Sequence, residues 1–283
     1  MVTRIITSAV GIVAAIVILF FSDTLVFNFA ISAVSAIMVH EILDACKCLQ
    51  YRLQTIVCLI FAAATPILVD VESMLVTYVF ATLCIFCLFA GYIRIHKRLH
   101  FDKLCVMLAT TLLISLSMTC IVSLRRLSDL HGVCYVVLAL AGAWLGDSGA
   151  YFTGTFFGKR KLCPEISPKK TVEGAIGGVL TTPIIFVLYA FGYHKFYAFN
   201  GEYFDVYYPA IIIMGLLCGI FGIIGDLCAS LLKRQYNVKD FGTIMPGHGG
   251  FMDRFDSVLF VAPFMALTLN SINLFSAELM VTI

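Results

Sequence analysis

The stretch YPAIIIMGLLCGIFGIIGDLCASLL runs from Tyr208 to Leu232 and contains a single charged residue, Asp226. A helix needs about 20 apolar residues to cross a hydrocarbon core of about 30 Å, so this stretch predicts a membrane span. The following residues, up to Asp256, read KRQYNVKDFGTIMPGHGGFMDRFD and are rich in Lys, Arg, Asp and Gly. Such a charge cluster is costly beside a bilayer unless it has a function. Its composition indicates binding of phosphate and a divalent cation.

The whole chain has the composition of a polytopic membrane protein. Of its 283 residues, 61% are hydrophobic and 13% are charged, and the mean hydropathy is +0.99. A soluble fold cannot hide this much apolar sequence from water. We therefore predict an all-α transmembrane protein with about nine spans, at residues 5–21, 24–43, 54–69, 74–93, 104–124, 133–157, 174–193, 208–232 and 257–275. Pro66 and Pro183 fall inside two of these spans, where neighbouring helices can absorb a kink.

The distribution of positive charge predicts the orientation, because Lys and Arg in loops are retained on the cytoplasmic side. With a cytoplasmic N-terminus, sixteen of the nineteen lysine and arginine residues fall on cytoplasmic segments. The exceptions are Arg125, Arg126 and Lys195. Both long polar loops, 158–173 and 233–256, then face the cytosol. Residues 1–21 also have the basic start and apolar core of a signal peptide, but no clear small-residue cleavage site follows, which favours a span.

The two halves of the chain differ in what they reveal. We interpret residues 1–132 as a transmembrane scaffold and residues 133–283 as the part that carries the catalytic site. In the first half, His40, Glu41 and Asp44 are interpreted as polar side chains that reach the headgroups from the end of a span. The basic run from Arg94 to Lys103 is interpreted as a cytoplasmic anchor that attracts anionic headgroups.

Small residues recur every three or four positions in two spans of the second half. They are Gly142, Gly146, Ala150, Gly154 and Gly158 in one span, and Gly215, Gly219, Gly222 and Gly225 in the other. Such ridges allow close helix contact, including contact in a homodimer. We expect close contact to bring together the polar residues of both spans, Asp147 and Asp226 among them. A carboxylate at this depth needs a partner or a cation, although structural helix pairing is an alternative role.

The charged stretch after residue 230 supplies the groups for phosphate and metal chemistry. Asp226, Ser230 and Lys233 are spaced i, i+4 and i+7 and would form one line on a helix. Asp253 and Asp256 are three residues apart and would face the same way on a helix. Oxygen ligands of this kind suit Mg²⁺, which completes its shell with water and substrate phosphates. Two metals would stabilise both the attacking and leaving oxygens of a phosphoryl or nucleotidyl transfer.

Two loops could contact the phosphates. The run from Pro246 to Gly250 has few side chains, so its backbone N–H groups could close around an anion, although a flexible loop is an alternative. In the other loop, Ser167 or Thr171 could cap the next helix, with Lys169 and Lys170 beside a phosphate. Positive-inside anchoring is the alternative role for these lysines.

The combination implies a reaction between a water-soluble phosphate donor and a membrane lipid, because positioning and charge neutralisation suffice without a covalent nucleophile. The chain contains no GxSxG, HExxH or GxxxxGK[ST] motif. An ion-coupled transporter that uses Asp147 and Asp226 is a competing hypothesis. The halves show no convincing inverted repeat, which disfavours it.

The residues resemble a known family, the integral-membrane CDP-diacylglycerol synthases or phosphatidate cytidylyltransferases. The family motif S-x-L-K-R-x4-K-D-x5-P-G-H-G-G-x2-D-R-x-D is matched at every fixed position from Ser230 to Asp256. The segment from Gly146 to Gly174 is similar to the family's second motif, and the resemblance covers about Trp144 to Asp256. Ala229 stands where the family usually has an acidic residue, and Ser148 stands where Thr is commoner.

The resemblance implies that phosphatidate attacks the α-phosphate of CTP and that Mg²⁺ is the expected cofactor. A second metal or a monovalent cation beside the Mg²⁺ is compatible with the resemblance. It implies that the catalytic residues are Asp226, Lys233, Arg234 and Asp253, with Asp226, Asp253 and Asp256 as metal ligands. The implied substrate-binding residues are Ser167, Lys169, Lys170, Thr171, Ser230, Lys239, Asp240, His248, Gly249 and Arg254.

The expected partners are CTP, phosphatidate and membrane lipids, with no nucleic acid. The expected location is a bacterial inner or plasma membrane. A CTP-dependent polyprenol or phytol kinase is the competing enzyme hypothesis, because it would share the membrane setting, the nucleotide and the metal.

Overall fold

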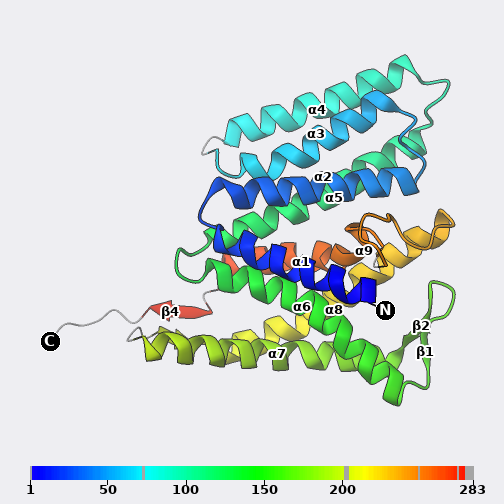
Figure 1. The fold of residues 1–283 in the computed structure, drawn as a ribbon. Helices are drawn as coiled ribbons and strands as arrows, with labels where there is room; N and C mark the ends of the chain where they lie inside the picture. Colours follow the sequence, from blue (N-terminus) through cyan, green and yellow to red (C-terminus); the bar gives the residue numbers. More distant parts are fainter. Residues whose placement is uncertain (1, 72–73, 201–203, 248, 273, 278–283) are drawn as a thin grey trace. The chain divides into compact units, whose positions relative to one another are not determined.

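The computed structural model describes residues 2–71, 74–200, 204–247, 249–272 and 274–277 (Figure 1). The helices are α1 (Val2–Phe20), α2 (Leu25–Ala45), α3 (Arg52–Leu68), α4 (Met74–Arg94), α5 (Phe101–Arg126), α6 (Gly132–Phe157), α7 (Val172–Phe199), α8 (Tyr208–Gln235), α9 (Met252–Phe255) and α10 (Val258–Leu269). The strands are β1 (Lys161–Cys163), β2 (Ser167–Thr171), β3 (Phe204–Val206) and β4 (Phe275–Ala277).

Each of the nine apolar stretches predicted from the sequence contains a helix, α1 to α8 and α10. Within the described residues, six helices, α2 and α4 to α8, are long and apolar enough to cross a membrane. The same residues also include three shorter apolar helical segments, Ala9–Phe20, Arg52–Leu68 and Val258–Leu269. Both α3 and α7 continue through their internal prolines, Pro66 and Pro183. The structure is therefore that of a mainly helical membrane protein.

Two small sheets depart from the purely helical prediction. β1 pairs with β2, and β3 pairs with β4, in both cases antiparallel. Their strands are only three to five residues long, too short for a clear alternating pattern in the sequence.

The chain forms two compact units. The first contains the described residues up to Ser123 together with Leu232–Leu259, and the second contains Leu124–Leu231 together with the described residues from Phe260. Residues 232–259 therefore pack with the N-terminal helices, although they carry the charged motif. The functional division at residue 132 concerns where the catalytic groups lie and stays a prediction.

The first unit is built on helices that lie side by side, α2, α3 and α4 (Figure 1). Met38, Ile42 and Leu43 of α2 are almost fully buried. Phe61 of α3 stacks on Phe80 of α4, with 6.0 Å between the ring centroids. This apolar packing holds α2 in the first unit.

In the second unit, α6 and α7 run alongside each other, and the β1–β2 hairpin lies at the end of this pair (Figure 1). The glycine ridge of α6 contacts α7: a Cβ at Gly146 would lie 2.9 Å from Thr182 Oγ1. The ridge of α8 also meets α7, because a Cβ at Gly219 would lie 2.8 Å from the Cα of Val179. The ridges therefore pack on a third helix, α7, and a homodimer would need another surface.

Candidate functional site

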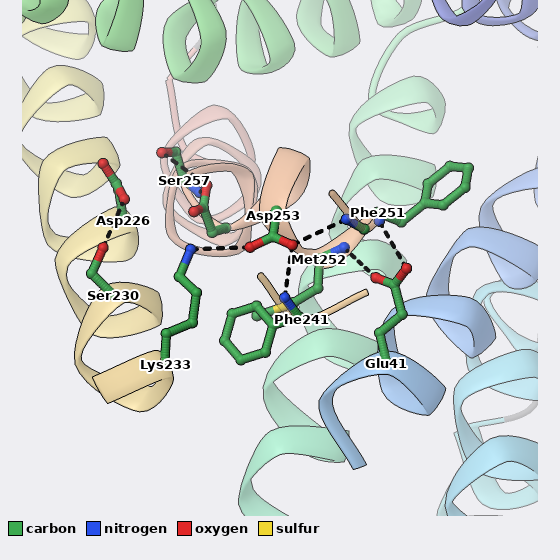
Figure 2. Close-up of polar contacts among 11 residues, drawn as sticks. Glu41, Asp226, Ser230, Lys233, Phe241, Phe251, Met252, Asp253 and Ser257 are labelled. Carbon is green, nitrogen blue, oxygen red and sulfur yellow. Dashed lines mark hydrogen bonds and ion pairs between the residues drawn. The ribbon is translucent and has the colours of Figure 1, made fainter. Parts of the chain in front are cut away.

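In the second unit, Asp226 forms a polar cluster with two residues that are predicted to bind substrate, Lys170 and Ser230. Lys170 forms an ion pair with Oδ2 of Asp226, and the Ser230 hydroxyl donates a hydrogen bond to Oδ1 at 3.3 Å (Figure 2). The predicted i, i+4 relationship on one helix is confirmed, because α8 includes both Asp226 and Ser230. The side chains of Lys170 and Asp226 are 24% and 22% exposed, so water and ligands can reach this pair.

The β1–β2 hairpin determines where Lys170 lies. Thr171 ends β2 and caps α7, with its Oγ1 accepting a hydrogen bond from the Gly174 N–H at 3.1 Å, as predicted for this loop. Glu173 fastens the base of the hairpin, because its carboxylate accepts hydrogen bonds from the N–H groups of Lys159 and Arg160 at 3.0 and 3.2 Å. The Thr171 cap and the hydrogen bonds of Glu173 together fix the position of β2, the strand that includes Lys170.

In the first unit, Asp253 is the acceptor for three hydrogen bonds from around the glycine-rich loop (Figure 2). Lys233 Nζ lies 3.0 Å from Oδ1, and the N–H groups of Phe241 and Gly250 donate to Oδ2 at 2.8 and 3.1 Å. The side chain of Asp253 is only 4% exposed and that of Lys233 is 13% exposed. A buried carboxylate with these partners fixes both ends of the segment between Phe241 and Gly250.

Glu41 of α2 contacts the glycine-rich segment, whereas its position at the end of an apolar stretch predicted that it would reach the lipid headgroups. It is 3% exposed, and its carboxylate accepts hydrogen bonds from the N–H groups of Phe251 and Met252 at 3.1 and 2.8 Å (Figure 2). A Cβ added to Gly242 or Gly250 would collide with the Glu41 carboxylate. Glu41 therefore anchors the same loop from the other side. Spacing gave no signal for this contact, because about 210 residues separate the partners.

A cavity of about 540 Å³ opens beside this loop. Its lining includes four residues predicted to bind substrate, Lys239, Asp240, Gly249 and Arg254. Gly247 and Gly249 adopt φ angles of 81° and 86°, a left-handed conformation that other residues rarely adopt. The Met245 N–H donates to the Gly249 carbonyl at 2.9 Å and closes the turn. The cavity thus combines two cationic side chains with a backbone shape that only glycine readily allows.

The other predicted site residues are distributed as follows. Asp256 is 7% exposed and accepts a hydrogen bond from the Ser257 N–H at 2.8 Å. Arg234 is exposed near the end of α8, and Lys169 is exposed on β2. Ser167 pairs with Cys163 across the hairpin. His248 lies outside the described residues, and Ala229, at the position where the resemblance predicts an acid, is buried at 3% exposure.

The carboxylates differ in how well they suit Mg²⁺. Among the described residues, no three or more His, Cys, Asp or Glu side chains form a metal-binding group. Mg²⁺ can nevertheless bind through one or two carboxylates, with water and phosphates as further ligands. Asp226 fits this mode, because it is partly exposed and already faces a cation, the ammonium of Lys170. Asp253 has less free capacity, since three of its roughly four acceptor positions are used.

Comparison with known proteins assigns the chain to a family. The sequence model of the cytidylyltransferase family matches residues 2–272. The chain belongs to this family. The match includes α1 to α8 and the whole charged motif, so the family likeness extends well beyond the segment from Trp144 to Asp256 that contains the two family motifs.

Two curated relatives of the chain share the name phosphatidate cytidylyltransferase. A phosphatidate cytidylyltransferase of Bacillus subtilis (strain 168) is 38% identical over 173 residues, which cover 61% of this chain and 61% of that protein. A phosphatidate cytidylyltransferase of Staphylococcus haemolyticus (strain JCSC1435) is 42% identical over 138 residues, or 49% of this chain and 50% of that protein. The matched stretch therefore spans about half to three fifths of the length of these relatives.

Proposed function

We propose that this protein is a phosphatidate cytidylyltransferase, which converts CTP and phosphatidate into CDP-diacylglycerol and pyrophosphate. A phosphate oxygen of phosphatidate attacks the α-phosphorus of CTP, and the bond from that phosphorus to the oxygen bridging to the β-phosphate breaks. The phosphate monoester is largely ionised at neutral pH, since its second pKa is about 6, so no general base on the protein is needed. The observation that carries this proposal is the glycine-lined cavity with its two cationic side chains in a chain of this family.

The residues support distinct tasks. Lys239 and Arg254, with the turn formed by Gly247 and Gly249, would bind phosphates of CTP, because cations and backbone N–H groups both stabilise anionic oxygens. Lys233 and Lys170 each neutralise an aspartate in the structure, and each is available to contact a phosphate when that aspartate binds a cation. Ser167, Lys169, Ser230, Arg234 and Asp240 are proposed as supporting contacts to substrate.

We further propose Mg²⁺ as the cofactor, with Asp226 as the better supported ligand and with Asp253 and Asp256 as the other predicted ligands. When bound, the cation would neutralise negative charge on the reacting phosphates. The support is the partly exposed carboxylate of Asp226, which already pairs with an ammonium group. A second metal or a monovalent ion remains a sequence-based prediction.

We also propose that the protein crosses a bacterial inner membrane nine times and that its N-terminus is cytoplasmic. This topology is supported by the helix that the described residues form in each of the nine predicted stretches. It is also supported by the concentration of Lys and Arg in alternate connecting segments, because such residues are usually retained on the cytoplasmic side. A C-terminal alkaline phosphatase fusion should be active in the periplasm, because an odd number of spans places the two termini on opposite sides. A fusion protein that is expressed but has no phosphatase activity in the periplasm would contradict the nine-span topology.

The decisive experiment offers purified protein α-³²P-labelled CTP and Mg²⁺, with phosphatidate and a polyprenol in parallel reactions. Label in a lipid product from phosphatidate, together with unlabelled pyrophosphate, is the expected result. A polyprenol kinase would transfer label only from γ-³²P-labelled CTP. Absence of any labelled lipid, combined with Mg²⁺-independent uptake of ions by proteoliposomes, would favour the transporter hypothesis instead.

A further inference from the structure

A second cavity, of about 750 Å³, lies in the first unit among residues that the proposed reaction does not use. Its lining comes from the start of α3, the end of α4 and the connection that follows α4. Three arginines are part of this lining, Arg52, Arg94 and Arg98. All three are exposed, and none forms an ion pair with another residue in the part of the chain that the structure describes. The cavity therefore presents a concentrated positive charge.

The start of α3 adds unpaired backbone donors to this charge. Tyr51 occupies the N-cap position and makes no side-chain capping hydrogen bond. The first N–H groups of a helix lack helical acceptors and favour negative charge. The Tyr51 hydroxyl instead donates to the Arg98 carbonyl at 3.0 Å, which ties the connection after α4 to the start of α3. The arginines on these two segments are thus held around one space.

Gln54 supplies the observation that distinguishes this cavity from an ordinary basic helix end. Its side chain is fully buried at 0% exposure, yet neither its Nε2 nor its Oε1 has a hydrogen-bond partner. A buried amide without partners is unfavourable and calls for a ligand or water. Gly91 faces this amide, because a Cβ at position 91 would lie 2.6 Å from Gln54 Nε2. Both residues line the cavity.

The position of the cavity indicates where its ligand comes from. Arg94 is the last residue of α4, one of the six helices long and apolar enough to cross a membrane. Basic residues at the end of such a helix lie at the depth of the lipid headgroups. An anion at this depth is most simply the phosphate of a lipid. Guanidinium groups match phosphate well, because their paired N–H groups can contact two oxygens at once.

We propose that this cavity binds the phosphate group of an anionic membrane lipid, through Arg52, Arg94 and Arg98 and the amide of Gln54. The site is separate in its residues from the glycine-lined cavity, and the inference does not depend on the proposed reaction. A phosphate monoester headgroup, with up to two negative charges, should bind more tightly than a phosphodiester headgroup with one.

The test measures lipids bound to the purified full-length protein by native mass spectrometry. The protein is exchanged into micelles with phosphatidylcholine alone, or with added phosphatidate or phosphatidylglycerol. We expect selective retention of phosphatidate. A guanidinium that hydrogen-bonds directly to a phosphate contributes at least about tenfold in affinity, so the double substitution Arg94→Gln with Arg98→Gln should weaken retention by about 100-fold.

Two further variants separate a built site from diffuse charge. Lys97→Gln removes a positive charge from the same segment at an exposed residue that is not among the cavity lining, and it should change retention by less than about twofold. Gln54→Leu should weaken retention several-fold, because it removes the amide that contacts the phosphate. Thermal stability should be kept or raised, because the substitution removes a buried polar group that has no hydrogen-bond partner in the protein. If the arginine variant unfolds, Gln54→Leu decides the question in a folded protein.

Several results would overturn the proposal. Equal losses in the Lys97 and arginine variants would show that general surface charge holds the lipid. Unchanged retention in Gln54→Leu, with retained stability, would remove the amide from the site. Displacement of the lipid by millimolar inorganic phosphate, with no preference for the lipid, would identify a free-phosphate site instead. CTP binding measured by titration calorimetry should be unchanged in every variant, which separates this site from the proposed reaction.

Discussion

Lys233 and Asp253 form a buried ion pair across 20 positions of sequence, with 3.0 Å between Nζ and Oδ1. The same aspartate accepts hydrogen bonds from the N–H groups of Phe241 and Gly250. The pair therefore connects the end of α8 to both ends of the glycine-rich segment. At the proposed CTP site, this arrangement would couple the charge of Lys233 to the shape of the glycine-rich segment.

Asp253→Asn should reduce lipid nucleotidylation at saturating Mg²⁺ to below about a tenth of the wild-type rate. The substitution removes the negative charge that Lys233 faces and replaces one acceptor oxygen with a donor, so it disturbs the loop whether or not Asp253 binds metal. Activity with α-labelled CTP and thermal unfolding should be measured together. Wild-type turnover in a folded Asp253→Asn protein would remove this residue from the site.

Glu41→Gln should loosen the glycine-rich segment, because Phe251 and Met252 donate to different carboxylate oxygens and the NH₂ group that replaces one of these oxygens cannot accept a hydrogen bond. Loss of one such bond costs about 1–3 kcal/mol, so amide hydrogen exchange at Phe251 and Met252 should accelerate and KM for CTP should rise. Asp44→Asn is the matched control, because Asp44 is exposed on the same helix. Equal effects in both variants would contradict a positioning role for Glu41.

Gly250→Ala should be destabilising only while Glu41 is present. Gly250 has an ordinary negative φ, since positive φ among the described glycines is confined to Gly247 and Gly249, so the cost of alanine comes from its collision with the Glu41 carboxylate. In a double-mutant cycle with Glu41→Ala, the thermal cost of Gly250→Ala should fall by at least about 1 kcal/mol. Additive costs would show that the two residues do not interact.

Lys170→Met should lower the Mg²⁺ concentration needed for half-maximal activity, because it removes the ammonium that pairs with Asp226. Its maximal rate should also fall, since a phosphate contact is lost. Asp226→Asn should raise the Mg²⁺ requirement or abolish activity. Lys161→Met, an exposed residue on the neighbouring strand, serves as the control. An unchanged Mg²⁺ requirement in Lys170→Met would argue against Asp226 as a ligand.

Stability should fall below about pH 6.5 because of His131. This residue is 5% exposed and lies outside the long apolar helices, and burial lowers its pKa from the ordinary value of 6.5. Below pH 6.5 His131 is therefore protonated more readily in the unfolded chain than in the folded chain. The stability contribution of neutral His131 is complete above pH 6.5 and is lost as the pH falls toward the lowered pKa. Thermal unfolding of wild type and of His131→Phe, which keeps the ring contacts with Phe204 and Phe275, should diverge only in this range. Parallel curves at every pH would exclude the effect.

Much of the site was predictable where the relevant partners are close in sequence. The spacing of Asp226 and Ser230 on one helix, and the cap that Thr171 provides to α7, depend on contacts three or four residues apart, which helix geometry alone defines. The apolar stretches likewise predicted the positions of nine helices, because the required length follows from bilayer thickness.

The tertiary structure decided what depends on distant segments. The placement of Glu41 against Met252, the packing of both glycine ridges on α7, and the cavity around Gln54 each join residues whose sequence separation carries no signal. Composition and hydropathy predict which stretches form helices long enough to cross a membrane. They do not fix which helix meets which, because that choice depends on the packing of side chains and the pairing of buried polar groups over the whole chain.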